Sequence, residues 1–192
     1  MSATASMSEH GKLPLEPLDT PENWFIRLLF RVFEKRYGVI PTAFRVVYPR
    51  SPFLAVVALV LIAGVTRFLR LPHELAFLVK ISLSLRNGCT FCADISLAEA
   101  ARARVGRERF RELLSFEDSD CFSAREKAAL GYVKALHESL RIPDEVWAEL
   151  KTHFNERERI DLVWICAVEQ YFNTMAVPLR IGSDHLADRA VG

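Results

Sequence analysis

Apolar side chains recur at helical spacing along most of the chain. Trp24, Leu28 and Val32 follow one another four residues apart, which places them on one face of a helix. No segment shows the strict alternation of apolar and polar residues that is typical of a strand. The pattern therefore predicts an all-α protein. Helices are expected at 21–37, 44–48, 54–69, from 72 to the Asn87-Gly88 pair, 89–104, 107–114, 123–140, 143–153, from 155 to Pro178, and 183–189.

Capping signals mark the starts of three of these helices. Ser123 with Glu126, and Asn155 with Glu158, have the spacing of a capping box, in which two side chains satisfy free backbone N–H groups reciprocally. Thr20 precedes Pro21, which predicts Thr20 as the N-cap of the first helix. Residues 1–19 are expected to form a flexible N-terminal arm, which leaves 20–192 as a single all-helical domain.

Two segments are apolar almost all round. Residues 53–65 form the longest apolar run, which is too short for a membrane span of roughly 20 residues and predicts a buried core helix. The segment 75–85 is expected inside a bundle or an oligomer for the same reason. The N-terminus lacks the apolar core of a secretory signal, so we expect a cytoplasmic protein without a membrane partner.

Composition narrows the function. The 192 residues are 51% hydrophobic, which supports a sizeable core, and the formal net charge of +1 comes without a long basic run. Nucleic acid is therefore not expected as a partner, because phosphate binding needs concentrated positive charge. No glycine-rich nucleotide motif is present, so we expect no organic cofactor.

The candidate chemistry lies at Cys89 and Cys92, directly after Asn87-Gly88. Cysteines three apart share a helix face, and a stop signal before them would expose a helix N-terminus that favours thiolate. This pattern predicts a redox dithiol. Two ordinary core cysteines, or a zinc site, are the alternatives. Zinc needs four ligands, and no second C-x-x-C or H-x-x-x-H is present, so no metal is expected. Cys121 and Cys166 are interpreted as structural.

Several motifs in order resemble one known family, the carboxymuconolactone decarboxylase-like, AhpD-type alkylhydroperoxidase proteins, over residues 35–182. The motifs are Tyr37-Gly-Val-Ile-Pro41 with Ser51-Pro52, Glu74-Leu75, Asn87-Gly88-Cys89-x-x-Cys92, Ser123-Ala-Arg-Glu126, Pro143-Asp-Glu-Val-Trp147 and Val168-Glu-Gln-Tyr-Phe-Asn173. The resemblance implies a helical bundle around a hairpin that carries C-x-x-C, a homo-oligomer (trimer or hexamer), and peroxide reduction with an unknown dithiol reductant. It implies that Cys92 is oxidised to sulfenic acid and that Cys89 closes the disulfide.

The sequence departs from the family at its proton relay. The resemblance implies a Glu twelve residues before the first cysteine and a His four residues after the second, where this chain has Phe77 and Ser96. Ser96 cannot act as a base near neutral pH, and the loss of a general base typically removes ~10²–10⁴ of rate. Weak peroxidase activity is therefore predicted, with Glu74, Ser96 and Glu169 as candidate accessory residues.

Other polar residues are interpreted more plainly. Asp94 is expected to be a first-turn aspartate that the helix dipole favours, and His73 and His137 to be ordinary histidines. Two further functions stay open beside the dithiol peroxidase or thiol–disulfide oxidoreductase: a non-catalytic oligomeric redox sensor or interaction protein, and a lactone decarboxylase-like enzyme.

Overall fold

The computed structural model describes residues 12–106 and 108–190, and within these ranges every regular element is a helix. The all-α prediction is therefore confirmed. The elements, in chain order, are α1 (Trp24–Tyr37), α2 (Thr42–Val47), α3 (Pro52–Arg67), α4 (His73–Arg86), α5 (Thr90–Arg102), the 3₁₀ helix η1 (Glu108–Ser115), α6 (Ala124–Glu138), α7 (Asp144–His153), α8 (Glu156–Ala176) and α9 (Leu186–Arg189).

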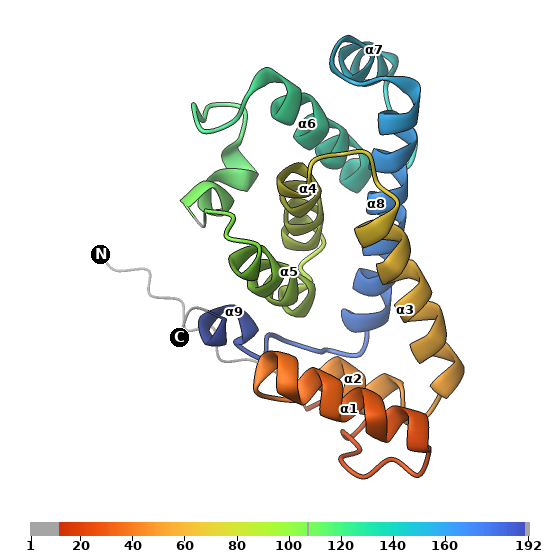
Figure 1. Cartoon of the computed structure of the whole chain (residues 1–192). Helices are drawn as coiled ribbons and strands as arrows, with labels where there is room; N and C mark the ends of the chain where they lie inside the picture. The colour runs from red at the N-terminus through yellow and green to blue at the C-terminus, as the bar shows by residue number, and fades with distance from the viewer. Residues whose placement is uncertain (1–11, 107, 191–192) are drawn as a thin grey trace.

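The central element is α4, which packs against α5, α6, α8 and η1 (Figure 1). Its apolar residues point in several directions, and Leu78, Val79, Ile81 and Leu83 are all at most 1% exposed. Each such side chain stabilises the fold by about 1.5–3 kcal/mol through burial. The chain itself thus covers the helix that was expected to need either a bundle or an oligomer around it.

Local capping explains where the helices begin. Both predicted capping boxes are present, at Ser123 with Glu126 and at Asn155 with Glu158. The first helix differs from the prediction: its N-cap is Asn23, whose Oδ1 accepts hydrogen bonds from the N–H groups of the second and third helical residues at 2.9 and 3.4 Å. Asparagine is a strong N-cap, so it takes precedence over Thr20 three residues earlier.

The long apolar helix α3 is not a buried core helix. It packs against α1 and α8, yet the side chains of Phe53 and Val60 are 73% and 65% exposed. Its buried positions are mostly small, at Ala55 and Ala58. The prediction failed because an apolar run does not say which neighbours the fold supplies. None of the described helices combines the length and apolarity that a membrane crossing requires.

The two ends of the described chain meet beside α5. The segment after α8 leads to α9, which packs against α5, and α1 and α2 lie near that end of the molecule (Figure 1). Residues 1–11 of the predicted arm lie outside the described residues. Its described part is held against α2, because the Leu18 N–H donates to the Arg45 carbonyl at 3.0 Å and Asp19 pairs with Arg45 at 2.7 Å.

Candidate functional site

The site begins at the turn between α4 and α5. Gly88 has a φ of +68°, a left-handed conformation that glycine adopts without strain. The Gly88 N–H donates to the Leu85 carbonyl at 3.2 Å, and the Cys89 N–H donates to the Ser84 carbonyl at 2.9 Å. These two bonds form a Schellman motif. The Asn87-Gly88 stop signal is confirmed, and it fixes Cys89 directly beside the last turn of α4.

The two cysteines open the next helix. Cys89 is the N-cap of α5, and its Sγ accepts a hydrogen bond from the Cys92 N–H at 3.3 Å. The two side chains are joined in a disulfide, with their Cα atoms 5.3 Å apart. Free N–H groups and the positive end of the helix dipole lie at this position, which favours a thiolate once the disulfide is reduced.

The disulfide lies under an apolar cover. Cys89 and Cys92 are only 1% and 2% exposed, and they pack in one cluster with buried residues from α1, α2, α5, α8 and the C-terminal segment. Among these are Phe30, Phe44 and Ala176. A reactant therefore reaches the sulfur atoms only if it is small or if part of this cover moves.

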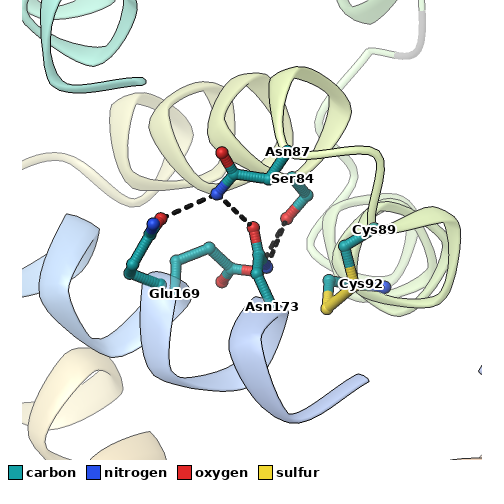
Figure 2. Close-up of a disulfide and its surroundings, with 7 residues drawn as sticks. Ser84, Asn87, Cys89, Cys92, Glu169 and Asn173 are labelled. Carbon is teal, nitrogen blue, oxygen red and sulfur yellow. Dashed lines mark hydrogen bonds between the residues drawn. A yellow bond between two sulfur atoms is a disulfide. The ribbon is translucent and has the colours of Figure 1, made fainter. Parts of the chain in front are cut away.

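A buried polar network lies on the other side, between α4 and α8 (Figure 2). The Ser84 hydroxyl donates to Glu169 Oε1 at 2.7 Å, and the Asn173 amide donates to the same oxygen at 3.1 Å. Asn173 also approaches the Ser84 hydroxyl at 3.4 Å. Ser84, Glu169 and Asn173 are each at most 3% exposed. The structure thus brings Glu169, a predicted accessory residue, into this network.

The network continues to the surface through Asn87. Its Nδ2 donates to Asn173 Oδ1 at 2.8 Å and to Oε1 of the exposed Gln170 at 2.7 Å. Its Oδ1 lies 2.9 Å from Nδ1 of the exposed His137, so that nitrogen must carry the hydrogen. The sequence presented Asn87 only as a helix stop and His137 as an ordinary histidine, and neither signal foretold this pairing.

Burial dominates the electrostatics around Glu169. Loss of water raises the pKa of Glu169, while the charge of Lys80 on α4 and the bonds from Ser84 and Asn173 act in the opposite direction. Burial also raises the pKa of the Cys166 thiol, one turn earlier on α8. Glu169 is therefore a carboxyl that retains its proton more readily than an ordinary glutamate.

Asp94 has a different role from the one expected. Its Oδ2 accepts hydrogen bonds from the Ser183 hydroxyl at 2.9 Å, the Asp184 N–H at 3.1 Å and the Leu186 N–H at 2.9 Å, and its Oδ1 accepts one from the Ala187 N–H at 2.9 Å. Asp94 is thus no first-turn partner of its own helix. It anchors the C-terminal segment that covers the cysteines.

The structure also places Glu74, Phe77 and Ser96, the residues that the sequence analysis considered in connection with the family's proton relay. Glu74 is exposed in the first turn of α4, where it pairs with Arg109, and the structure does not bring it into the polar network. Phe77 packs against the apolar cluster that contains Leu113 and Leu130. Ser96 is 2% exposed on α5, one turn after Cys92. No acid–base group occupies the Phe77 or Ser96 position.

The remaining cysteines lie apart from the disulfide. Cys121 is exposed, with Sγ 3.6 Å from Glu112 Oε1, and Cys166 is buried in the core that includes Val79 and Leu162. Within the described residues, no three His, Cys, Asp or Glu side chains gather in a way that could hold a metal ion.

Comparison with known proteins indicates one family. The model of the carboxymuconolactone decarboxylase family matches residues 62–135. An uncharacterised protein of Bacillus subtilis (strain 168), YdfG, is 32% identical over 104 residues, which are 53% of this chain and 71% of that protein.

Solved structures share the fold. The debrominase Bmp8 in its apo form superposes with a TM-score of 0.78 at 22% identity, over 94% of this chain and 97% of that one. A putative antioxidant defence protein AhpD from Agrobacterium tumefaciens, of unknown function, gives a TM-score of 0.67 at 24% identity, over 71% of this chain and 94% of that one. With a matching family model, a relative at 32% identity and this shared helical fold, the chain belongs to the carboxymuconolactone decarboxylase family, of the AhpD-like type.

Proposed function

We propose that this protein is a thiol–disulfide oxidoreductase that reduces peroxides through Cys89 and Cys92. The observation that carries the proposal is the disulfide between these residues at the N-terminus of α5. A pair that is close enough to bond, and that opens a helix, has both requirements of a redox dithiol. Membership of a family with AhpD-type peroxidases supports the same reading.

The reaction divides into two half-reactions. In the first, the Cys92 thiolate attacks a peroxide oxygen, the O–O bond breaks, and the released alkoxide takes up a proton to leave as an alcohol. The Cys89 thiol then displaces water from the sulfenic acid and closes the disulfide. In the second, a dithiol reductant attacks the disulfide, and its own two thiols become a disulfide while both cysteines regain their protons.

The site favours small and uncharged substrates. The cysteines lie under an apolar cover that includes Phe44 and Ala176, and burial of an unpaired charge there would be costly. Phe77 and Ser96 cannot supply an acid or base near neutral pH. We therefore expect slower peroxide turnover than in a member with a Glu and a His at these positions.

Replacement of each cysteine tests the proposal. Cys92→Ser should abolish peroxide consumption in the presence of dithiothreitol, and Cys89→Ser should stop turnover after one oxidation at Cys92. The matched control is Cys121→Ser, since this cysteine is exposed and lies outside the site. If both site variants consume peroxide as fast as the control, the proposed function is wrong.

One further measurement separates an enzyme from a redox sensor. Peroxide should convert two thiols of the reduced protein into one disulfide in either case, and mass spectrometry should show the loss of two hydrogen atoms. Only an enzyme consumes many equivalents of peroxide when dithiothreitol is supplied in excess. A single equivalent per chain would favour the sensor.

Self-association is part of the proposal. The side chains of Phe53, Val56 and Val60 on α3 are apolar and exposed. They favour a homo-oligomer, because a second copy of the chain packed on this helix would remove its apolar surface from water. Light scattering should give a mass that is a multiple of the chain mass of 21.8 kDa. Phe53→Asp with Val60→Asp should reduce that mass to a single chain.

A further inference from the structure

We propose that Glu169 is the acid–base group of the cysteine pair and that it acts through Ser84 and Asn173. This inference rests on the proposed function, because it assigns the proton donor for the same disulfide. It places that donor on α8, far in sequence from the positions where the family relay is absent.

Ser84 links the carboxyl to the cysteines. Its carbonyl accepts the Cys89 N–H at 2.9 Å, and its hydroxyl donates to Glu169 Oε1 at 2.7 Å. One residue is therefore bonded both to the backbone of Cys89 and to the carboxyl of Glu169. The cysteines also pack in one cluster with Ala176, which lies three residues after Asn173 on α8. Figure 2 shows the network beside the disulfide.

The hydrogen bonds run in one direction, from the surface towards Glu169. His137 donates to Asn87, Asn87 donates to Asn173, and Asn173 donates to Glu169. The neutral donors leave the carboxyl able to exist in either protonation state, whereas a guanidinium would hold it as an anion. No arginine or lysine forms an ion pair with Glu169 among the described residues.

Few titratable groups surround this carboxyl. Lys80 on α4 acts on it through its charge. Cys166 lies on the same helix, and burial raises the pKa of its thiol. Tyr132 on α6 faces Cys166, and burial likewise raises its phenol pKa. Burial keeps Cys166 and Tyr132 neutral near pH 7, so Lys80 is the charged neighbour that acts on the pKa of Glu169.

The chemistry balances during disulfide reduction. A reductant thiolate attacks one sulfur, the S–S bond breaks, and the second cysteine leaves as a thiolate. The Ser84 hydroxyl, which donates to Glu169 in the oxidised protein, turns to this thiolate and gives it a proton, and takes a proton from Glu169 in exchange, so that Glu169 becomes a carboxylate. The second thiol of the reductant then loses its proton, which returns to Glu169, and attacks the mixed disulfide to release the reduced pair.

Reduction of the disulfide by dithiothreitol tests this role without any peroxide. The rate constant is measured across pH and corrected for the thiolate fraction of the reagent. For the wild type it should be on the order of 10²-fold above that of Glu169→Gln at low pH. The ratio should fall towards one as pH rises, because the wild type then loses the proton that the variant never had.

A second measurement excludes a merely structural effect. Alkylation of the reduced cysteines by iodoacetamide requires no proton donor, so Glu169→Gln should react at least as fast as the wild type. A loosened or misfolded site would change both reactions at every pH by the same factor. Ser84→Ala, which keeps the helix but removes the hydroxyl, should slow reduction with the same pH dependence.

Glu74→Gln is the matched control, because it makes the same chemical change at an exposed glutamate of the neighbouring helix. Equal rates for wild type and Glu169→Gln at every pH would overturn the inference, as would a Ser84→Ala variant that behaves as the wild type. A protein that shows the predicted pH dependence but consumes no peroxide would instead contradict the proposed peroxidase function.

Discussion

Two buried carboxylates flank the cysteine pair, and the protein holds them in different ways. Asp94 accepts four hydrogen bonds from residues 183–187, three of them from backbone N–H groups. Glu169 accepts its bonds from two neutral side chains, Ser84 and Asn173. Asp94 is 7% exposed and Glu169 is 3% exposed, so burial alone does not distinguish them.

The donors explain the difference in role. Backbone N–H groups cannot turn away without unwinding the segment that carries them, so Asp94 is fixed as an anchor for the C-terminal cover. Hydroxyl and amide groups can rotate and adapt to either protonation state. Burial raises the pKa of Glu169, and the opposing effects of Lys80 and of the two neutral hydrogen-bond donors do not offset it. Asp94 thus holds the C-terminal segment in place, whereas Glu169 is the carboxyl that can take part in the proposed proton transfer.

The largest effect is expected at the anchor. Asp94→Ala removes the acceptor for four donors and leaves backbone N–H groups at 184, 186 and 187 without it. Each such group costs about 1–3 kcal/mol, so the free energy of unfolding should fall by about 3–5 kcal/mol. Urea denaturation measures this loss. Hydrogen exchange should show faster opening of residues 183–190.

Asp188→Asn is the control for that variant. Asp188 lies on α9, the short helix whose N–H groups Asp94 accepts, but its side chain is 77% exposed and its pairing with His185 spans 3.6 Å. Its free energy of unfolding should stay within about 0.5 kcal/mol of the wild type. If Asp94→Ala also stays within 1 kcal/mol, the apolar contacts of Leu186 hold the segment, and the comparison between the two carboxylates loses its basis.

Much of the fold was predictable because its signals are local. The capping boxes at Ser123 and Asn155 depend on residues three positions apart, and the αL turn at Gly88 depends on glycine itself. Which of the two apolar helices, α3 or α4, the rest of the fold buries could not be predicted from such local signals. Both are apolar nearly all round, yet the fold surrounds α4 and leaves Phe53 and Val60 of α3 exposed.

The same distinction between local and long-range signals holds for the candidate site. The spacing of Cys89 and Cys92 was enough to predict the pair, since both lie on one helical turn. The partners of the two carboxylates come from far along the chain: Ser84 and Glu169 are 85 residues apart, and Asp94 and Asp184 are 90 apart. Only packing brings such residues together, so Glu169 could be a candidate from its place in an apolar stretch, but its partners could not be predicted.

The second largest effect is expected for Glu169→Gln, in how its free energy of unfolding changes with pH. The folded-state pKa of Glu169 is raised by burial above the ordinary value of 4.5, so the folded protein binds this proton more tightly than the unfolded chain does. The stabilisation is complete below about pH 4.5 and is lost as pH rises towards the folded pKa. Glu169→Gln cannot suffer this loss. Its free energy of unfolding should therefore rise relative to the wild type, by at most about 1.4 kcal/mol per pH unit.

Urea denaturation at several pH values measures this difference, because all other groups titrate alike in both proteins. Asp94→Asn is unsuitable as a reference, because the NH2 group of the new side chain would be placed against a backbone N–H group that now donates to Asp94. Glu74→Gln serves instead, because it makes the same chemical change at an exposed glutamate. A constant difference for Glu169→Gln would mean that the folded and unfolded states bind this proton equally, and that burial does not raise the pKa of Glu169.

The smallest effect is expected at Glu74, the third carboxylate that the sequence offered. Its side chain is 48% exposed, and its partner Arg109 keeps a second ion pair with Glu126 at 2.7 Å. Glu74→Gln should therefore lower the free energy of unfolding by about 0.5 kcal/mol or less, because an exposed ion pair contributes little. The rate of disulfide reduction by dithiothreitol should equal that of the wild type across pH. A slowing that matched Glu169→Gln would show that the first turn of α4 serves the cysteines, and that a buried position between α4 and α8 is not what qualifies a carboxylate for this chemistry.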